Sequence, residues 1–218
     1  PDLTHAFLTS PILTDAKLER AFLGGAFLIG RDLRSSILTD AKLEGADLGG
    51  AILIGSDLRS AILTGAKLEG ANLRDANLRD VNLEGAKLEG ADLTGADLGN
   101  ADLRDVKLKG VYSGNITNYP KNLNDDLFVT SNGYLIGPGA NLEFANLRGT
   151  YLGGANLTRA NLTRAKLRGV SSGDIKGEIK KLPERCANKK PTNASPDTAT
   201  SCFLPIDDFK ILDIIKYS

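Results

Sequence analysis

The chain has 218 residues, in which 27 Lys and Arg balance 27 Asp and Glu, with a single His, two Cys and neither Met nor Trp. This balance argues against a generally basic nucleic-acid binder and a strongly acidic nucleic-acid mimic, and one His excludes sites that need several. No stretch reaches the ~18–20 apolar residues of a membrane span, and no signal peptide is recognisable. From the start at Pro1 and the absence of Met we expect a processed or trimmed chain.

Residues 1–113 form a first repeat block with leucine at every fifth position. From Leu3 to Leu108, 22 consecutive pentads have Leu at their centre, and the residue two before it is Ala in 15 of them. Gly, Asp and Ser, which favour turns, predominate two residues after each Leu. Residues 11–35 and 36–60 are identical at 20 of 25 positions, which indicates an internal duplication.

A period of five fits neither an α-helix nor a continuous strand. Successive leucines would rotate by about 140° around a helix and would alternate between the two faces of a strand. A backbone that turns a corner every five residues instead places each Leu, and the small residue two before it, inside. Four sides then close a square coil of 20 residues, and coils stack at ~4.8 Å. The pattern therefore predicts an all-β solenoid that buries all 28 leucines of the five-residue pattern in one continuous stack, broken only near residues 114–139.

Two serines test this register. Ser36 and Ser56 occupy inward positions separated by four pentads, which is one predicted coil, so we expect them in the same column of adjacent coils. Because a buried hydroxyl needs a hydrogen-bond partner, each should donate to a backbone carbonyl.

Arg31 also occupies an inward position, where an unpaired guanidinium would be costly to bury. Either the coil bulges at residues 30–32, or the side chain passes Pro11 toward the N-terminal end and meets Asp15 or Asp32. We favour the second route, because Arg can bury its stem and keep its charge in water.

Apolar side chains interrupt the outward positions of the N-terminal half. Phe7 and Phe27 are also separated by one predicted coil, so they should stack on one face. Because exposed apolar patches mark contacts, we expect this end to meet a protein partner, a second copy in a weak dimer, or residues upstream of Pro1. The alternative is a set of unrelated exposed apolar residues. The candidate interaction patch comprises Phe7, Ile12, Phe22, Phe27 and Ile37.

The register breaks after the first block. We assign residues 114–139 to an inserted loop and connector. The apolar Leu123, Leu127, Phe128 and Tyr134 of this region should pack against a coil face. Residues 140–172 form a second block with leucines from Leu142 to Leu167. The spacing from Leu108 to Leu142 falls one residue short of seven pentads, so the two blocks are out of phase.

Residues 173–218 form a tail that lacks the repeat. Cys186 and Cys202 fit one disulfide, worth roughly 3 kcal/mol for a loop of this length; two unpaired thiols are the alternative. An apolar stripe at 206, 209, 212 and 215 predicts a C-terminal helix. We interpret it as a cap on the leucine core, which solenoids need at their ends. An interfacial membrane helix and a partner-binding helix remain alternatives.

The repeated motif resembles that of the pentapeptide-repeat family, as in Ala71-Asn72-Leu73-Arg74-Asp75 and Ala91-Asp92-Leu93-Thr94-Gly95. The resemblance covers about 140 residues and implies a right-handed quadrilateral β-helix, here of about seven coils in two blocks. The segment Asn132-Gly133-Tyr134-Leu135-Ile136-Gly137-Pro138-Gly139-Ala140-Asn141-Leu142 is similar to a connector in cyanobacterial and other bacterial members.

No catalytic, cofactor-binding or metal-binding constellation is evident. The outward Asp92, Asp97 and Asp102 should lie on successive sides of the square, where they cannot share a metal. We expect a non-catalytic scaffold for protein interaction or structure, without nucleic-acid contacts. The cysteine pair favours an extracytoplasmic location, in a periplasm or thylakoid lumen.

The resemblance also implies an alternative, because some members imitate DNA and bind the topoisomerase gyrase. Such mimicry would need on the order of 15 net negative charges along the block. Residues 1–110 carry 13 basic and 17 acidic side chains, a net charge of −4, which disfavours it.

Overall fold

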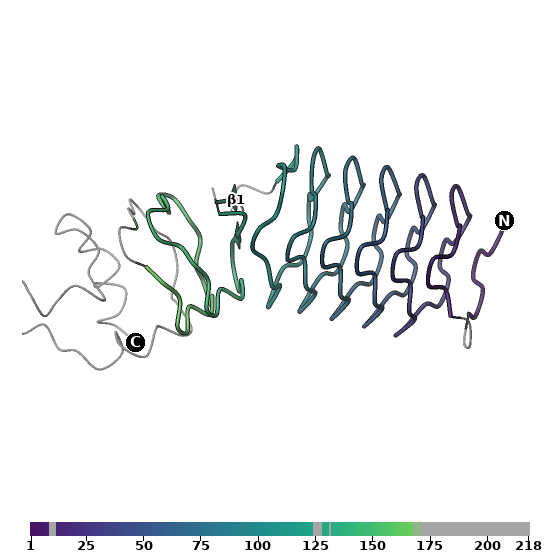
Figure 1. Ribbon diagram of the computed structural model, residues 1–218, viewed down its shortest axis with the longest axis horizontal. Helices are drawn as coiled ribbons and strands as arrows, with labels where there is room; N and C mark the ends of the chain where they lie inside the picture. The colour runs from purple at the N-terminus through teal and green to yellow at the C-terminus, as the bar shows by residue number, and fades with distance from the viewer. Residues whose placement is uncertain (9–11, 124–127, 131, 168–169, 171–218) are drawn as a thin grey trace, which may run out of the picture. The chain divides into compact units, whose positions relative to one another are not determined.

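The computed structural model describes residues 1–8, 12–123, 128–130, 132–167 and 170 (Figure 1). The chain divides into two compact units, unit 1 from Pro1 to Asp125 and unit 2 from Asp126 to Ser218. The predicted disulfide between Cys186 and Cys202 and the predicted capping helix both lie outside the described residues. Within the described ranges, no helix has the length and hydropathy that a membrane crossing requires.

Unit 1 is a stack of 20-residue coils, whose repeated turns are visible in Figure 1. Every parallel bridge in it joins a residue to the one 20 positions later, from Asp2 with Phe22 to Asp102 with Asn122. The predicted square coil is therefore confirmed in its length. Ser36 and Ser56 lie in neighbouring coils, because the amide of Asp57 donates to the Ser36 carbonyl at 2.9 Å.

The corners arise from a four-residue turn centred on the two residues after each Leu. The amide of Ala26, for example, donates to the Leu23 carbonyl at 3.0 Å. The second turn residue has a positive φ, 57° at Asp40 and 63° at Gly45. Gly, Asn and Asp tolerate this conformation better than other residues. The turn-favouring residues that predominate two positions after each Leu therefore lie at the corners, as the pattern predicts.

The Asn or Asp before many leucines has a structural cause. Its side-chain oxygen accepts the amide of the first turn residue, as Asn82 does from Glu84 at 3.0 Å and Asp92 from Thr94 at 3.0 Å. This Asx turn satisfies an amide that the turn itself leaves free. Asn and Asp thus stabilise the corner while their side chains lie on the outer surface.

The core of unit 1 is the predicted leucine ladder. All leucines of the pattern from Leu18 to Leu108 are buried, and Leu63 is 1% exposed. Leu3, Leu8 and Leu13 are only half-buried, so the expectation of full burial is wrong for them. They belong to the first coil, which has a neighbouring coil on one side only.

The inward serines behave differently from each other. The Ser56 hydroxyl donates to the Leu53 carbonyl at 2.7 Å, as predicted. The Ser36 hydroxyl is equally buried but has no partner among the described residues, so the prediction is wrong there. The backbone is the same at both sites, because each amide donates at 3.1 Å to the carbonyl of the Leu three residues earlier. The difference is therefore the side-chain rotamer.

Arg31 does not cause a bulge. Its amide donates to Leu28 at 3.0 Å and its carbonyl accepts from Ile52 at 2.9 Å, the bonds that Ala makes in other coils. The half-buried side chain donates from Nε to the Ile29 carbonyl at 3.0 Å. The bulge is thus excluded, while the route past Pro11 falls on a residue outside the described ranges. Asp32, one of the two proposed partners, is bound by Arg34 at 2.6 Å.

Unit 2 begins with a short antiparallel pair, β1 (Phe128–Val129) and β2 (Leu135–Ile136). The repeats that follow have the same 20-residue offset, with Asn141 bridged to Asn161. The leucines from Leu142 to Leu162 form a core of their own. Leu167 packs against it but is only partly buried, so the expectation of full burial is wrong for Leu167 as well. Tyr134 packs against this core, as expected, and its hydroxyl oxygen accepts the Asn146 amide at 3.1 Å.

Removing a rung of the ladder should leave a cavity. We expect Leu63→Ala to lower the free energy of unfolding by roughly 2–5 kcal/mol, because its neighbours cannot collapse fully. Urea denaturation measures the change, with Thr64→Ala at the exposed turn as the control, expected within about 0.5 kcal/mol. A loss below about 1 kcal/mol for Leu63→Ala would contradict the buried ladder.

The two serines provide a matched pair. Ser56→Ala should lower the free energy of unfolding by about 1 kcal/mol because it removes a buried hydrogen bond. Ser36→Ala should be neutral or stabilising, because it removes a buried hydroxyl without a partner. Equal losses in denaturant unfolding would show that both hydroxyls are bonded in solution.

Candidate interaction surface

The residues that precede each Leu form four columns, one on each side of unit 1. Neighbouring members of a column are one coil apart, and we number the faces in chain order. Face 1 has Asp2, Phe22, Lys42, Ile62, Asn82, Asp102 and Asn122; face 2 has Phe7, Phe27, Asp47, Lys67, Lys87 and Lys107; face 3 has Ile12, Asp32, Ile52, Asn72, Asp92 and Tyr112; face 4 has Lys17, Ile37, Asp57, Asn77, Asp97 and Thr117.

The five residues of the sequence-predicted patch do not form one surface. Phe22 lies on face 1, Ile12 on face 3 and Ile37 on face 4, because a step of one pentad turns one corner. Ile12 is 83% exposed, whereas Ile37 is half-buried. Only Phe7 and Phe27 share a face.

Phe7 and Phe27 form an exposed aromatic pair on face 2. Their ring centroids are 4.3 Å apart and the planes differ by 3°, which confirms the predicted stacking. Phe7 is 70% exposed and Phe27 38%. Ile29, two residues after Phe27, is also exposed and was missed, although an apolar residue at a turn position is a signal for it. We call these three residues the aromatic surface.

Phe22 is engaged within its own face. The ammonium of Lys42 lies 4.9 Å from its ring centroid, in the next coil of face 1. Such a cation–π contact contributes about 0.5–1 kcal/mol at an exposed site. Phe22 is therefore partly covered by its own chain.

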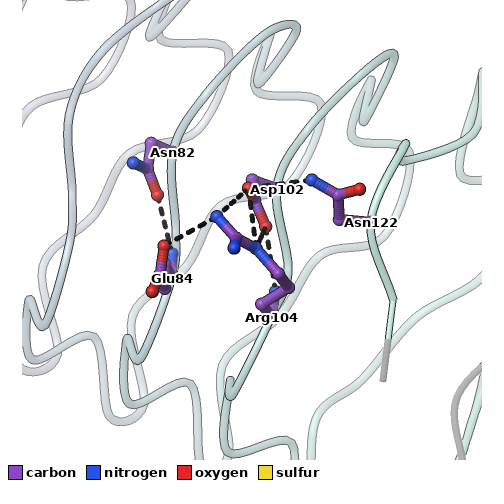
Figure 2. A network of polar contacts seen from close by, with 5 residues as sticks. All are labelled: Asn82, Glu84, Asp102, Arg104 and Asn122. Carbon is purple, nitrogen blue, oxygen red and sulfur yellow. Dashed lines mark hydrogen bonds and ion pairs between the residues drawn. The ribbon is translucent and has the colours of Figure 1, made fainter. Parts of the chain in front are cut away.

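The polar end of face 1 is a continuous network (Figure 2). The buried Asp102 accepts from Arg104 Nη2 at 2.8 Å and from Asn122 Nδ2 at 2.9 Å. The same Arg104 nitrogen reaches Glu84 in the previous coil at 2.8 Å. The Arg104 hydrogen bonds, helped by Asn122 and opposed by burial, lower the pKa of Asp102 to about 2. This arrangement holds a carboxylate charged and leaves it no proton to exchange near neutral pH.

Arginine neutralises the acidic residues on the other faces as well. Arg59 contacts Asp57 at 2.7 Å on face 4, and Arg74 lies 3.8 Å from Asp92 on face 3. Asp92, Asp97 and Asp102 lie on faces 3, 4 and 1, as expected. Across the described ranges, no group of three acidic, His or Cys side chains could hold a metal ion. The Arg74–Asp92 pair links neighbouring coils, whereas the Arg59–Asp57 pair lies within one coil.

A sequence model of pentapeptide repeats matches residues 12–50, 41–80, 71–110 and 139–171. No curated protein matches the chain.

Several solved structures resemble the chain. A pentapeptide repeat protein (Rfr23) from the cyanobacterium Cyanothece 51142 is 36% identical over 47% of this chain and 64% of its own, with a TM-score of 0.38. One from the thylakoid lumen of Arabidopsis thaliana is 33% identical over 44% of this chain and 63% of its own, with a TM-score of 0.29. A variant of QnrB1, a plasmid-mediated fluoroquinolone resistance protein, is 16% identical over 76% of this chain and 69% of its own, with a TM-score of 0.38. The chain thus spans less than two thirds of the first two.

The network around Asp102 predicts a pH dependence. Since its folded pKa of about 2 lies below the ordinary 3.8, its charge stabilises the fold above about pH 4 and is lost as the pH falls toward 2. In Asp102→Asn the side-chain oxygen can still accept the turn amide of Arg104, but the charge is removed. The substitution should therefore lower the free energy of unfolding by about 1–2 kcal/mol at pH 7. The difference in free energy of unfolding between Asp102→Asn and the unmodified protein should shrink as the pH is lowered.

Urea unfolding at pH 7, 4 and 2.5 measures this effect. Asp80→Asn is the control, because Asp80 is an exposed corner residue whose side chain makes no hydrogen bond or ion pair in the described part of the chain. A constant difference between Asp102→Asn and the unmodified protein from pH 7 to 2.5 would contradict the role of the charge.

Proposed function

Because this chain belongs to the pentapeptide-repeat family, we propose that it is an interaction scaffold that binds a protein partner through the aromatic surface of face 2. Proteins of this family are right-handed quadrilateral β-helices and are generally non-catalytic structural or binding proteins. The repeat provides a rigid prism on which outward side chains lie at fixed spacing.

The observation that carries this proposal is the exposed Phe7–Phe27 stack. Two parallel rings at 4.3 Å form a flat apolar area, and the exposed Ile29 follows Phe27 by two residues in the chain. Large exposed apolar side chains that cluster are typical of protein contacts. At most other outward positions the side chain accepts a turn amide, forms an ion pair or takes part in the Lys42–Phe22 contact. Face 2 is therefore the best available binding surface.

The finer architecture is part of the proposal. We propose about seven coils in two blocks and a tail that caps the second block with its C-terminal helix. The pair Cys186 and Cys202 supports an extracytoplasmic location, where a disulfide would persist. A weak dimer through the N-terminal end is the proposed alternative to a monomer.

The surface does not favour the DNA-mimicking alternative. Such a protein needs columns of uncompensated carboxylates, but those of Asp32, Asp57 and Asp102 are each bound to an arginine at 2.6–2.8 Å. An unchanged rate of gyrase supercoiling in the presence of the protein would agree with this argument.

The double variant Phe7→Ser with Phe27→Ser tests the proposed surface. Both side chains are exposed, so the fold should tolerate the change at a cost of about 1 kcal/mol, near the worth of an aromatic pair. Recovery of cross-linked partners from extracts of the source cells, and any self-association in sedimentation velocity, should fall strongly.

The matched control is Ile12→Ser, which removes an even more exposed apolar side chain from face 3. It should leave partner recovery unchanged. Equal recovery with the Phe7→Ser, Phe27→Ser variant would show that the aromatic pair is an ordinary exposed feature.

A further inference from the structure

Face 2 differs from the other three faces beyond its aromatic end. On faces 1, 3 and 4 the later outward positions carry Asn or Asp, whose oxygens accept the turn amides; these are Asn72, Asn77, Asn82, Asp92, Asp97 and Asp102. Face 2 has Lys67, Lys87 and Lys107 in those positions, bridged in register. We call these three residues the lysine column.

The lysines of face 2 are also less engaged than the arginines of unit 1. Carboxylate contacts are made by Arg20, Arg34, Arg59, Arg74, Arg79 and Arg104. Lys67 contacts Asp47 at 3.2 Å, but Lys87, Lys107 and the neighbouring Lys109 form no ion pair within the described part of the chain. Two unpaired ammonium groups, those of Lys87 and Lys107, therefore lie at one end of face 2, and that of Lys109 belongs to the adjoining turn.

Backbone donors accompany these charges. Because Lys cannot accept a hydrogen bond, the turn amides of Glu89 and Lys109 have no acceptor among the described residues. At this end of face 2 the turn amides are therefore available as hydrogen-bond donors. The equivalent amides of Thr94 and Arg104 on faces 3 and 1 are already bonded to Asp side chains.

We propose that the lysine column binds an acidic α-helix of a protein partner. Its ammonium groups arise at intervals of ~4.8 Å, so the outer two are ~9.6 Å apart. Acidic residues at positions i, i+3 and i+7 of a helix lie on one side at rises of ~4.5 and ~10.5 Å. A helix parallel to the solenoid axis can therefore place one carboxylate opposite each lysine.

The acidic turn residues that follow the lysines of the column favour a narrow partner. Glu69 and Glu89 follow Lys67 and Lys87 by two residues, at the first turn position of each corner, and both are half-buried. The Glu89 Oε2 atom is buried and has no hydrogen-bond partner in the described part of the chain. A bilayer or a nucleic-acid duplex presents negative charge across its whole width and would meet these carboxylates. One helix can contact the lysines and turn a neutral side toward the glutamates.

This inference rests on the proposed function and specifies the partner of the same face. Phe27 lies two coils beyond Lys67, ~9.6 Å along the column. An apolar residue seven positions before the first acidic one would reach it, at a rise of ~10.5 Å. The expected partner helix therefore has one apolar anchor followed by three acidic residues.

The test uses the full chain and a fluorescent synthetic helix of about 20 residues with Leu at i−7 and Glu at i, i+3 and i+7. A control peptide of equal composition has its Glu at i, i+2 and i+5, which point in different directions. Fluorescence anisotropy at low and physiological salt should show tighter binding of the first peptide, weakened by salt. Equal binding of both peptides would overturn the proposed register.

Lys87→Glu with Lys107→Glu should weaken binding of the matched peptide at least about tenfold. Lys17→Glu with Lys121→Glu, which makes the same charge change away from face 2, should change it less than about twofold. Equal losses would overturn the site. Tighter binding of the unmodified protein to phosphatidylserine vesicles or to single-stranded oligothymidylate would overturn the choice of a helix.

The Phe7→Ser, Phe27→Ser variant separates the two proposals. If partner recovery survives this variant and peptide binding still requires Lys87 and Lys107, only the aromatic surface is overturned. If peptide binding is insensitive to both lysines while partner recovery requires the two phenylalanines, only the lysine column is overturned.

Discussion

The fold depends on a hydrogen-bonded turn that recurs every five residues. The amide of each small inward residue donates to the carbonyl of the preceding Leu, at 3.0 Å from Ala26 to Leu23. The residue before that amide has a positive φ, which favours Gly, Asp or Asn at the corner, although Arg20, Ser35 and Phe144 also adopt it. Because the turn leaves one amide free, it also favours Asn or Asp before the Leu. The core, the corners and much of the surface follow from this single geometry.

The sequence predicted the features that the period determines. It placed Leu63 inside, Ser36 beside the coil of Ser56, and the rings of Phe7 and Phe27 against each other, because each needs only the 20-residue register. It did not predict features set by side-chain rotamers. The missing bond of Ser36 and the reach of Arg104 to Glu84 depend on torsion angles that a repeat pattern does not encode.

The candidate patch shows the same limit on the scale of the surface. Phe22 and Phe27 are close in sequence and chemically alike, but they lie on adjacent faces and have different surroundings. The ammonium of Lys42 lies over the exposed ring of Phe22, whereas Phe27 continues the column of Phe7. Sorting outward residues by their position within 20, and not by proximity in the sequence, would have separated them and would also have revealed the lysine column.

The 20-residue register has a further consequence for how such a surface can evolve. Gain or loss of one pentad would leave every leucine inside but rotate all later faces by a quarter turn. The 25-residue duplication illustrates this rotation: the Asp32–Arg34 pair on face 3 reappears as Asp57–Arg59 on face 4, at 2.6 and 2.7 Å. Only insertions or deletions of four pentads preserve a column across them. Selection for a continuous binding face would therefore act on repeat number in multiples of four, while selection for stability alone would accept any whole pentad.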